Sequence, residues 1–311
     1  MNFKRFMSPA FILRAGAAAM VVAALAACSS GSPRPKPAEL AANPALLGVR
    51  QAWSVRIPGV TFPLATDVSG DMVTVAGTDG TVVMIDARSG QESWRASAGA
   101  PLVAGVGSDG SLVAVVTANN DLVAMQSGKV LWKQRLTAQS YTAPLVAGRR
   151  VFVQAADRTT SAWDGQSGRR LWAQQRTAEN LVLKRPGVLI AVGDTLVSGI
   201  GGRLVGINPA NGSSRWESPI AAPRGTNDVE RLVDLTGSVS RVGDVVCARA
   251  YYASVGCVDT TRGALIWSKA HRQLGARGGG DDRARLDRVA SRDAVDVERG
   301  VCPVLLVVGL G

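Results

Sequence analysis

Few residues in this 311-residue chain could perform chemistry. Histidine occurs once, at His271, which argues against a histidine-based catalytic triad or a histidine-rich metal site. The acids Asp86, Asp164 and Asp259 each open a short turn, where a carboxylate usually accepts hydrogen bonds from its own backbone. We therefore expect no catalytic residue, no metal and no cofactor.

Two of the four cysteines lie close together in the chain. Cys247 and Cys257 flank an expected hairpin with a two-residue turn at Tyr252 and Ala253. This turn would place Cys257 opposite Ala248, with the two sulfur atoms on opposite faces of the sheet. An oxidising compartment would permit a disulfide, but the expected register favours two buried thiols.

Cys28 could undergo a different reaction, lipid attachment. A basic head is followed by an apolar stretch over residues 15–27, which is too short to span a bilayer as a mature helix. The residues before Cys28 resemble the bacterial lipobox, in which the cysteine becomes the lipid-modified N-terminus; an ordinary secretory signal is the alternative. We predict a signal peptide over 1–27 and a flexible tether over 28–44, and Ser29 resembles the signal for outer-membrane sorting.

A repeat that occurs five times must position any site. Each copy contains a β-rich run, a turn with one glycine, three further residues and a tryptophan. The pairs are Gly90 with Trp94, Gly128 with Trp132, Gly168 with Trp172, Gly212 with Trp216, and Gly263 with Trp267. Successive tryptophans are 38, 40, 44 and 51 residues apart, a spacing typical of propeller blades. We expect the glycines to adopt positive φ and the indoles to fill the seams between blades.

The repeat predicts an all-β fold, a β-propeller of four-stranded blades over residues 45–269. No run has a convincing helical period, and short apolar strands alternate with turns rich in Gly, Asn and Asp. Residues 52–57, around Trp53, look like the end of a repeat without its turn; in closed propellers such a strand often completes the last blade. Residues 270–311 lack the repeat, and we expect a disordered tail or the product of a shifted reading frame.

The net charge is +11, but the basic residues are scattered and only 5% of the residues are aromatic. Nucleic-acid binding usually requires clustered cations with interleaved aromatic side chains. The sequence therefore argues against a nucleic-acid partner.

The repeat resembles that of propellers related to pyrroloquinoline quinone enzymes. Two families share it, the quinoprotein alcohol dehydrogenases and the BamB family of outer-membrane-protein assembly factors. The lipobox, the chain length and two loop segments favour BamB. Residues 181–184, Leu-Val-Leu-Lys, are similar to that family's Leu-x-Leu-Arg loop, and residues 227–234 to its acidic-Arg-Leu-x-Asp segment. The family's ring has eight blades, so five repeats indicate an incomplete propeller, truncated or frame-shifted at the C-terminal end.

The resemblance implies a non-enzymatic lipoprotein scaffold of the β-barrel assembly machinery on the periplasmic side of the outer membrane. Its partners would be the BamA subunit, nascent outer-membrane proteins and, through a lipid such as palmitate on Cys28, the membrane. In that family the two loops dock on BamA. By position, the contact residues would be the apolar Leu181 and Leu183, the cations Lys184 and Arg185, and the polar Glu230, Arg231 and Asp234.

Alternatives remain for the loops and for the whole chain. Leu181 and Leu183 could be ordinary strand residues, and Glu230, Arg231 and Asp234 could pair among themselves. Lysine at position 184 weakens the argument for bidentate carboxylate recognition. The alternative functions are a periplasmic quinoprotein-like dehydrogenase or another propeller binding module. A quinoprotein enzyme would need a calcium-binding carboxylate cluster and usually carries adjacent cysteines, and the chain has no adjacent cysteines.

Overall fold

The computed structural model describes residues 51–63, 65–176, 181–251 and 253–270. These residues form β-strands and no α-helix, so the predicted all-β class is confirmed for them. Accordingly, none of their elements is a helix able to cross a bilayer. The predicted signal peptide (1–27), the tether (28–44), the lipid-attachment residue Cys28 and the tail from residue 271 onward lie outside the described residues and stay predictions.

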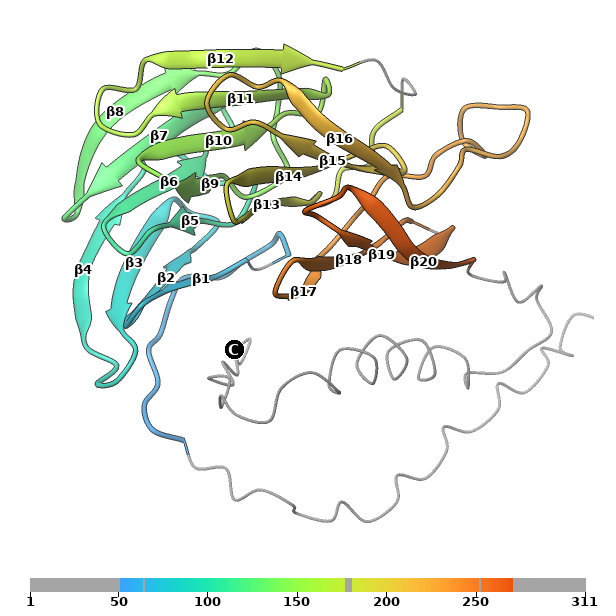
Figure 1. Cartoon of the computed structure of the whole chain (residues 1–311). Helices are drawn as coiled ribbons and strands as arrows, with labels where there is room; N and C mark the ends of the chain where they lie inside the picture. Colours follow the sequence, from blue (N-terminus) through green and yellow to red (C-terminus); the bar gives the residue numbers. More distant parts are fainter. Residues whose placement is uncertain (1–50, 64, 177–180, 252, 271–311) are drawn as a thin grey trace, which may run out of the picture. The chain divides into compact units, whose positions relative to one another are not determined.

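Four consecutive strands form each of five antiparallel sheets, which we number as blades 1 to 5 (Figure 1). Blade 1 contains β1 (Asp67–Ser69), β2 (Met72–Ala76), β3 (Thr81–Asp86) and β4 (Glu92–Ser97). Blade 2 contains β5 (Gly107–Ser108), β6 (Leu112–Val116), β7 (Asp121–Gln126) and β8 (Lys129–Arg135). Blade 3 contains β9 (Leu145–Ala147), β10 (Arg150–Gln154), β11 (Thr159–Asp164) and β12 (Arg170–Gln175).

The last two blades follow the same plan. Blade 4 contains β13 (Leu189–Val192), β14 (Thr195–Ile200), β15 (Arg203–Ile207) and β16 (Ser214–Pro219). Blade 5 contains β17 (Ser240–Val242), β18 (Val245–Arg249), β19 (Ser254–Asp259) and β20 (Ala264–Ala270). Every blade is therefore a meander of strands in chain order, and the five sheets agree with an incomplete propeller.

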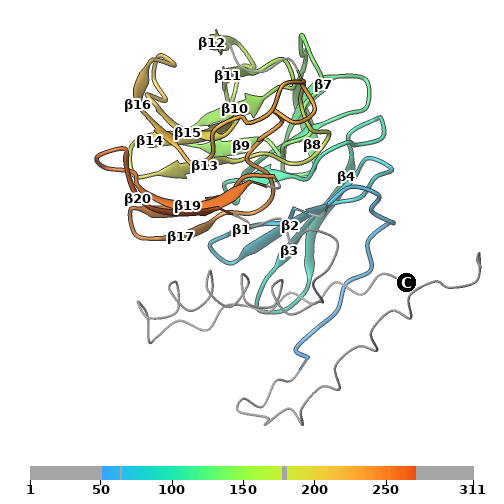
Figure 2. The ribbon, with the colours of Figure 1, turned by 90° about the vertical axis from the view of Figure 1, so that its right-hand side faces the viewer.

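The core lies between consecutive blades. Separate clusters of buried apolar residues join blade 1 to 2, 2 to 3, 3 to 4 and 4 to 5. The first strands of neighbouring blades also contact one another, β1 with β5, β5 with β9, and β9 with β13. Figures 1 and 2 show the consecutive sheets side by side. Each blade thus buries its apolar faces only by stacking on its neighbours, as in other repeat proteins.

The tryptophan at the outer strand of one blade packs on the glycine turn of the next. A Cβ added to Gly168 would come within 2.6 Å of the Trp132 ring, which leaves room for glycine only. The same close contact joins Trp172 to Gly212 and Trp216 to Gly263, and Trp94 packs on Gly128 more loosely, at 3.4 Å from the added Cβ. All five repeat glycines, Gly90 included, have φ between 65° and 79°, the left-handed region that favours glycine. These are the seam positions that the repeat spacing predicts; for Trp267 no following blade lies among the described residues.

Trp53 occupies the corresponding position on blade 1. Its ring lies against Gly90, and its Nε1 donates a hydrogen bond to the Ala87 carbonyl oxygen at 2.9 Å. Val55 and Ile57 pack with it on the apolar face of blade 1 that points away from blade 2. These residues belong to no strand, so the segment packs like the end of a repeat without strand hydrogen bonds.

The strand register corrects the expectation for the two cysteines. β18 and β19 pair Cys247 directly with Cys257, whereas the two-residue turn placed Cys257 opposite Ala248. The hairpin is longer than expected, because the Ala250 amide donates to the Ser254 carbonyl across the turn. The two side chains therefore share one face of the sheet, and the sulfur atoms are bonded in a disulfide.

Removing this disulfide in a Cys247→Ala/Cys257→Ala variant is expected to lower the free energy of unfolding by about 2–3 kcal/mol, since the bond closes a short loop in the unfolded chain. Chemical denaturation with and without reductant measures the effect. Reductant should destabilise the wild type to a similar extent and leave the variant unchanged. Equal stability of both proteins under oxidising conditions would contradict the expectation.

Candidate functional site

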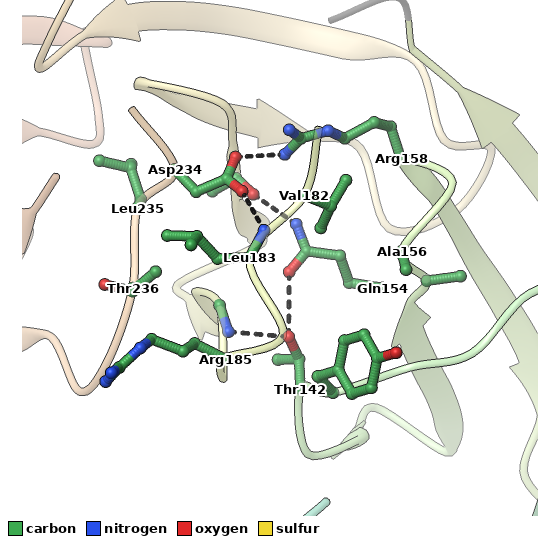
Figure 3. Close-up of a pocket in the computed structure, with 14 residues that line it drawn as sticks. Thr142, Gln154, Ala156, Arg158, Val182, Leu183, Arg185, Asp234, Leu235 and Thr236 are labelled. Carbon is green, nitrogen blue, oxygen red and sulfur yellow. Dashed lines mark hydrogen bonds and ion pairs between the residues drawn. The ribbon is translucent and has the colours of Figure 1, made fainter. Parts of the chain in front are cut away.

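Two loops interrupt the regular connections between blades. The first loop, residues 181–188, precedes β13, and the second loop, residues 220–239, joins β16 to β17. The second loop is the long connection between blades 4 and 5 in Figure 1. The close-up in Figure 3 shows the two loops meeting beside the end of blade 3.

Asp234 of the second loop connects the two loops to blade 3. Its Oδ2 accepts a hydrogen bond from the Leu183 amide at 2.9 Å, and its Oδ1 lies 2.5 Å from Nη1 of Arg158 (Figure 3). Arg158 comes from the β10–β11 turn, and its Nη2 donates to the Leu181 carbonyl oxygen at 2.9 Å. One ion pair therefore joins the first loop, the second loop and blade 3.

This geometry corrects the role expected of Asp234. The side chains of Arg158 and Asp234 are only 12% and 7% exposed, and both carboxylate oxygens have partners inside the molecule. Asp234 thus holds the first loop in place, and its carboxylate is already bonded within the molecule. The alternative that Asp234 pairs with Glu230 or Arg231 misses its actual partner, Arg158.

Polar side chains also fix the base of the first loop. The Gly187 amide donates to Oγ1 of Thr142 at 2.9 Å. Gln154, at the end of β10, donates through Nε2 to Oγ of Ser198 at 3.1 Å and to the carbonyl oxygen of Gly199. Since Ser198 and Gly199 belong to β14, these bonds connect blade 3 to blade 4 next to the first loop.

The first loop displays its cations against aromatic rings. Lys184 Nζ lies 5.7 Å from the ring centre of Tyr141, and the Arg185 guanidinium lies 5.7 Å from that of Tyr251. Both cations are exposed, and Leu181 beside them is 40% exposed, whereas Leu183 is half-buried. The rings restrict the cations without removing them from solvent.

The tip of the second loop is held by its own polar groups. Oε2 of Glu230 accepts a hydrogen bond from the Thr226 amide at 3.0 Å, and the Glu230 amide donates to Oδ1 of Asn227 at 2.9 Å. Glu230 remains exposed, and Arg231 is half-buried. The neighbouring Val229 is 73% exposed, the highest value among the large apolar residues described.

Sequence reasoning located both loops but missed Arg158 and Val229. Arg158 lies in a regular turn, 23 residues before Leu181 and 76 before Asp234, so no local motif connects them. Val229 lies inside the predicted segment 227–234. Because its neighbours in the sequence are polar, its exposure could have been predicted.

The pocket between the two loops is too small for a typical ligand. The pocket in Figure 3 has a volume of about 40 Å³, well below the roughly 300 Å³ or more that ligand pockets usually provide. Within the described part of the chain, no group of three His, Cys, Asp or Glu side chains could hold a metal ion.

The acids that open the repeat turns accept hydrogen bonds from the backbone of the same turns. Oδ1 of Asp86, Asp164 and Asp259 accepts a hydrogen bond from the amide of Ser89, Ser167 and Thr261 at 2.7, 2.8 and 2.9 Å. Backbone hydrogen bonds from Ser89 and Ser167 lower the pKa of Asp86 and Asp164, and the Thr261 hydroxyl lowers the pKa of Asp259.

These shifts make a small part of the stability acid-sensitive. Because the folded pKa lies below the unfolded value, the stabilisation is present above the unfolded pKa and is lost as the pH falls through the folded pKa. An Asp164→Asn variant is therefore expected to lose less stability than the wild type as the pH falls from about 5 through the unfolded pKa of about 3.9 and below it. Ser167→Ala, which removes a hydroxyl donor to Asp164, should also reduce this sensitivity. Urea denaturation at several pH values measures the stability of the wild type and both variants. The same loss of stability with falling pH in all three proteins would contradict a contribution from Asp164.

A family model described as outer membrane protein assembly factor BamB matches residues 78–281. The chain is 36% identical over 253 residues to the BamB of Bordetella pertussis, with 79% of this chain and 66% of that protein covered. It is 35% identical over 271 residues to the BamB of Burkholderia pseudomallei, with 86% and 70% covered. The chain thus spans about two thirds of the length of these relatives.

Solved structures show the same fold at lower sequence identity. The crystal structure of BamB from Moraxella catarrhalis matches with a TM-score of 0.59 and 21% identity, covering 66% of this chain and 63% of that one. A europium-containing methanol dehydrogenase matches with a TM-score of 0.53 and 14% identity, covering 71% and 53%. Likeness at these identities concerns the propeller fold alone.

Proposed function

The chain belongs to the BamB family of outer-membrane-protein assembly factors, and we propose that it is a non-enzymatic scaffold of the β-barrel assembly machinery. In this proposal a lipid on Cys28 anchors it to the periplasmic face of the outer membrane. It binds BamA through the first and second loops and thereby assists the folding and insertion of nascent outer-membrane proteins.

One observation carries the proposal. The two loops that the family resemblance links to BamA are separated by a whole blade in the sequence, yet Asp234 and Arg158 join them. Two loops held together in this way form a preorganised surface, which reduces the entropy that a partner must overcome on binding.

The exposed groups on these loops suit a protein partner. Leu181 and Val229 offer apolar side chains, and Lys184 and Arg185 lie beside Leu181 in the first loop. Protein interfaces often centre on a few apolar or arginine anchors surrounded by polar groups. The exposed Glu230 adds an acidic group at the second loop.

A binding measurement with the full chain and the periplasmic part of BamA tests the proposal. A Leu181→Asp/Lys184→Glu variant is expected to weaken binding by about tenfold or more, because it removes an apolar anchor and reverses an adjacent charge. Lys129→Glu reverses an exposed charge on blade 2 and serves as the matched control. Unchanged affinity in the double variant, with an unaltered melting curve, would remove the first loop from the interface.

A further inference from the structure

An open pocket of about 490 Å³ lies beside the two loops and is lined by residues of blades 3 and 4 and of the second loop. Ile200, Val205 and Val233 contribute a buried apolar wall. The turn between β14 and β15 borders the pocket closely, because Gly202 lies so near the Ala221 carbonyl oxygen that a Cβ would not fit. The volume is within the usual range for pockets that accept side chains or ligands.

The rim of this pocket is cationic. Arg158, Arg176 and Arg203 face two carboxylates, those of Asp234 and Glu217, so the lining carries one excess positive charge. Asp234 neutralises Arg158, and Oε1 of Glu217 lies 2.8 Å from Nη1 of Arg176. Within the described residues, Arg203 is exposed and has no ion-pair partner.

Arg176 has an unused donor. Its Nε is buried and has no hydrogen-bond acceptor among the described residues, although its Nη1 is paired with Glu217. Because this Nε is inaccessible, an incoming carboxylate would instead meet the accessible part of the Arg176 side chain, which is 22% exposed. Arg203 at the rim would add to the attraction for a negative charge.

We infer that this pocket receives an acidic segment of the partner protein in which an apolar side chain lies beside a carboxylate. The carboxylate matches Arg176 and Arg203, and the apolar side chain matches the wall formed by Ile200, Val205 and Val233. A small inorganic anion would leave this wall without a partner. Among the described residues, the lining contains no aromatic side chain on which a nucleotide base could stack.

The inference rests on the proposed protein-binding function and adds the chemistry of the bound segment. The pocket is continuous with the two-loop site, because Arg158 and Asp234 line both. A partner bound to the loops could therefore extend into the pocket without a second, separate interface.

Fluorescence anisotropy with short labelled peptides tests the inference independently of BamA. A peptide that alternates glutamate with leucine is expected to bind the full chain, whereas peptides alternating lysine with leucine, or glutamate with serine, should bind at least about fivefold more weakly. Arg203→Glu, and Ala221→Trp, which fills the pocket, should each weaken the glutamate–leucine peptide by a similar factor. Lys129→Glu should have no effect.

Three results would overturn the inference. The first is binding of the glutamate–leucine peptide that neither variant changes, and the second is equal binding of the glutamate–serine peptide. The third is full competition by inorganic phosphate without any advantage from leucine, which would indicate an anion site only. If Ala221→Trp fails to fold, peptide binding by the surface variant Arg203→Glu still tests the inference. If Arg203→Glu leaves BamA binding unchanged, the inference is contradicted but the proposed function is not. If the peptide binds and BamA does not, the proposed function is contradicted but peptide recognition by the pocket is not.

Discussion

Replacing Arg158 with alanine is expected to lower the free energy of unfolding by about 3–5 kcal/mol, the usual cost of breaking a buried ion pair by removing one partner. The variant leaves the Asp234 carboxylate, whose side chain is 7% exposed, without its counter-charge. It also removes the guanidinium that binds the Leu181 carbonyl oxygen. Urea denaturation of the full chain measures the loss.

A double-mutant cycle separates the ion pair from general effects of truncation. The Arg158→Ala/Asp234→Ala protein should be more stable than the sum of the two single losses predicts, because no charge remains buried alone. The pair Arg176–Glu217 provides a matched control, since it also bridges two blades but its side chains are 22% and 42% exposed. Breaking this more exposed pair by Glu217→Ala should cost only about 0–1 kcal/mol. Equal costs for the two pairs would contradict the structural role of Arg158.

Arg158→Ala should also weaken BamA binding, because the first loop loses its support. Arg158 is a positioning residue for the first loop, since its side chain is only 12% exposed and it acts through Leu181 and Asp234. Arg158→Lys keeps the charge but lacks the planar fork, so it should restore binding only in part. Tight BamA binding by a folded Arg158→Ala protein would show that the loop holds its shape without this residue.

Trp132→Ala is expected to lower the free energy of unfolding by about 3–5 kcal/mol, since it empties the seam between blades 2 and 3. The Trp132 side chain is 8% exposed, packs on Gly168 of the next blade, and donates through Nε1 to the Gly165 carbonyl oxygen at 2.8 Å. Its loss leaves a cavity and an acceptor without its indole donor at the same seam.

Two comparisons test whether the seam causes this effect. Trp267→Ala changes the same repeat position on β20, where the indole is half-buried, and should cost only about 1 kcal/mol. Gly168→Ala should destabilise the wild type through its Cβ contact with the Trp132 ring and its φ of 69°. In the Trp132→Ala background the contact is gone, so the same change should cost less. Equal losses for Trp132→Ala and Trp267→Ala would contradict the packing argument.

The regular part of the fold was predictable because its causes lie within a few residues of one another. A positive-φ glycine such as Gly168 and a tryptophan four positions later recur at blade spacing, and together they specify a turn and a seam contact. The turn acid Asp164 likewise binds amides two and three residues further on. The two loops of the candidate site were located by the resemblance of residues 181–184 and 227–234 to segments of the BamB family.

The hairpin of blade 5 shows where prediction from local sequence fails. A two-residue turn and the observed longer turn between Ala250 and Ser254 differ by one position in register. Because side chains alternate between the two faces of a strand, that single position decides whether Cys247 and Cys257 can bond. The observed turn also contacts the second loop, since the Tyr251 amide donates to the Asp234 carbonyl oxygen, and no local pattern predicts this bond.

By itself the sequence determined the propeller and its blade seams, since these depend on short-range spacing and turn chemistry, and resemblance to family segments located the two loops. Only the tertiary structure decided that Asp234 is buried, that Arg158 is its partner 76 residues away, and that a cationic pocket lies beside them. Such contacts join residues from different blades, and they depend on how neighbouring sheets pack against each other. No local pattern in the chain encodes that arrangement, because it results from the packing of all the apolar faces together.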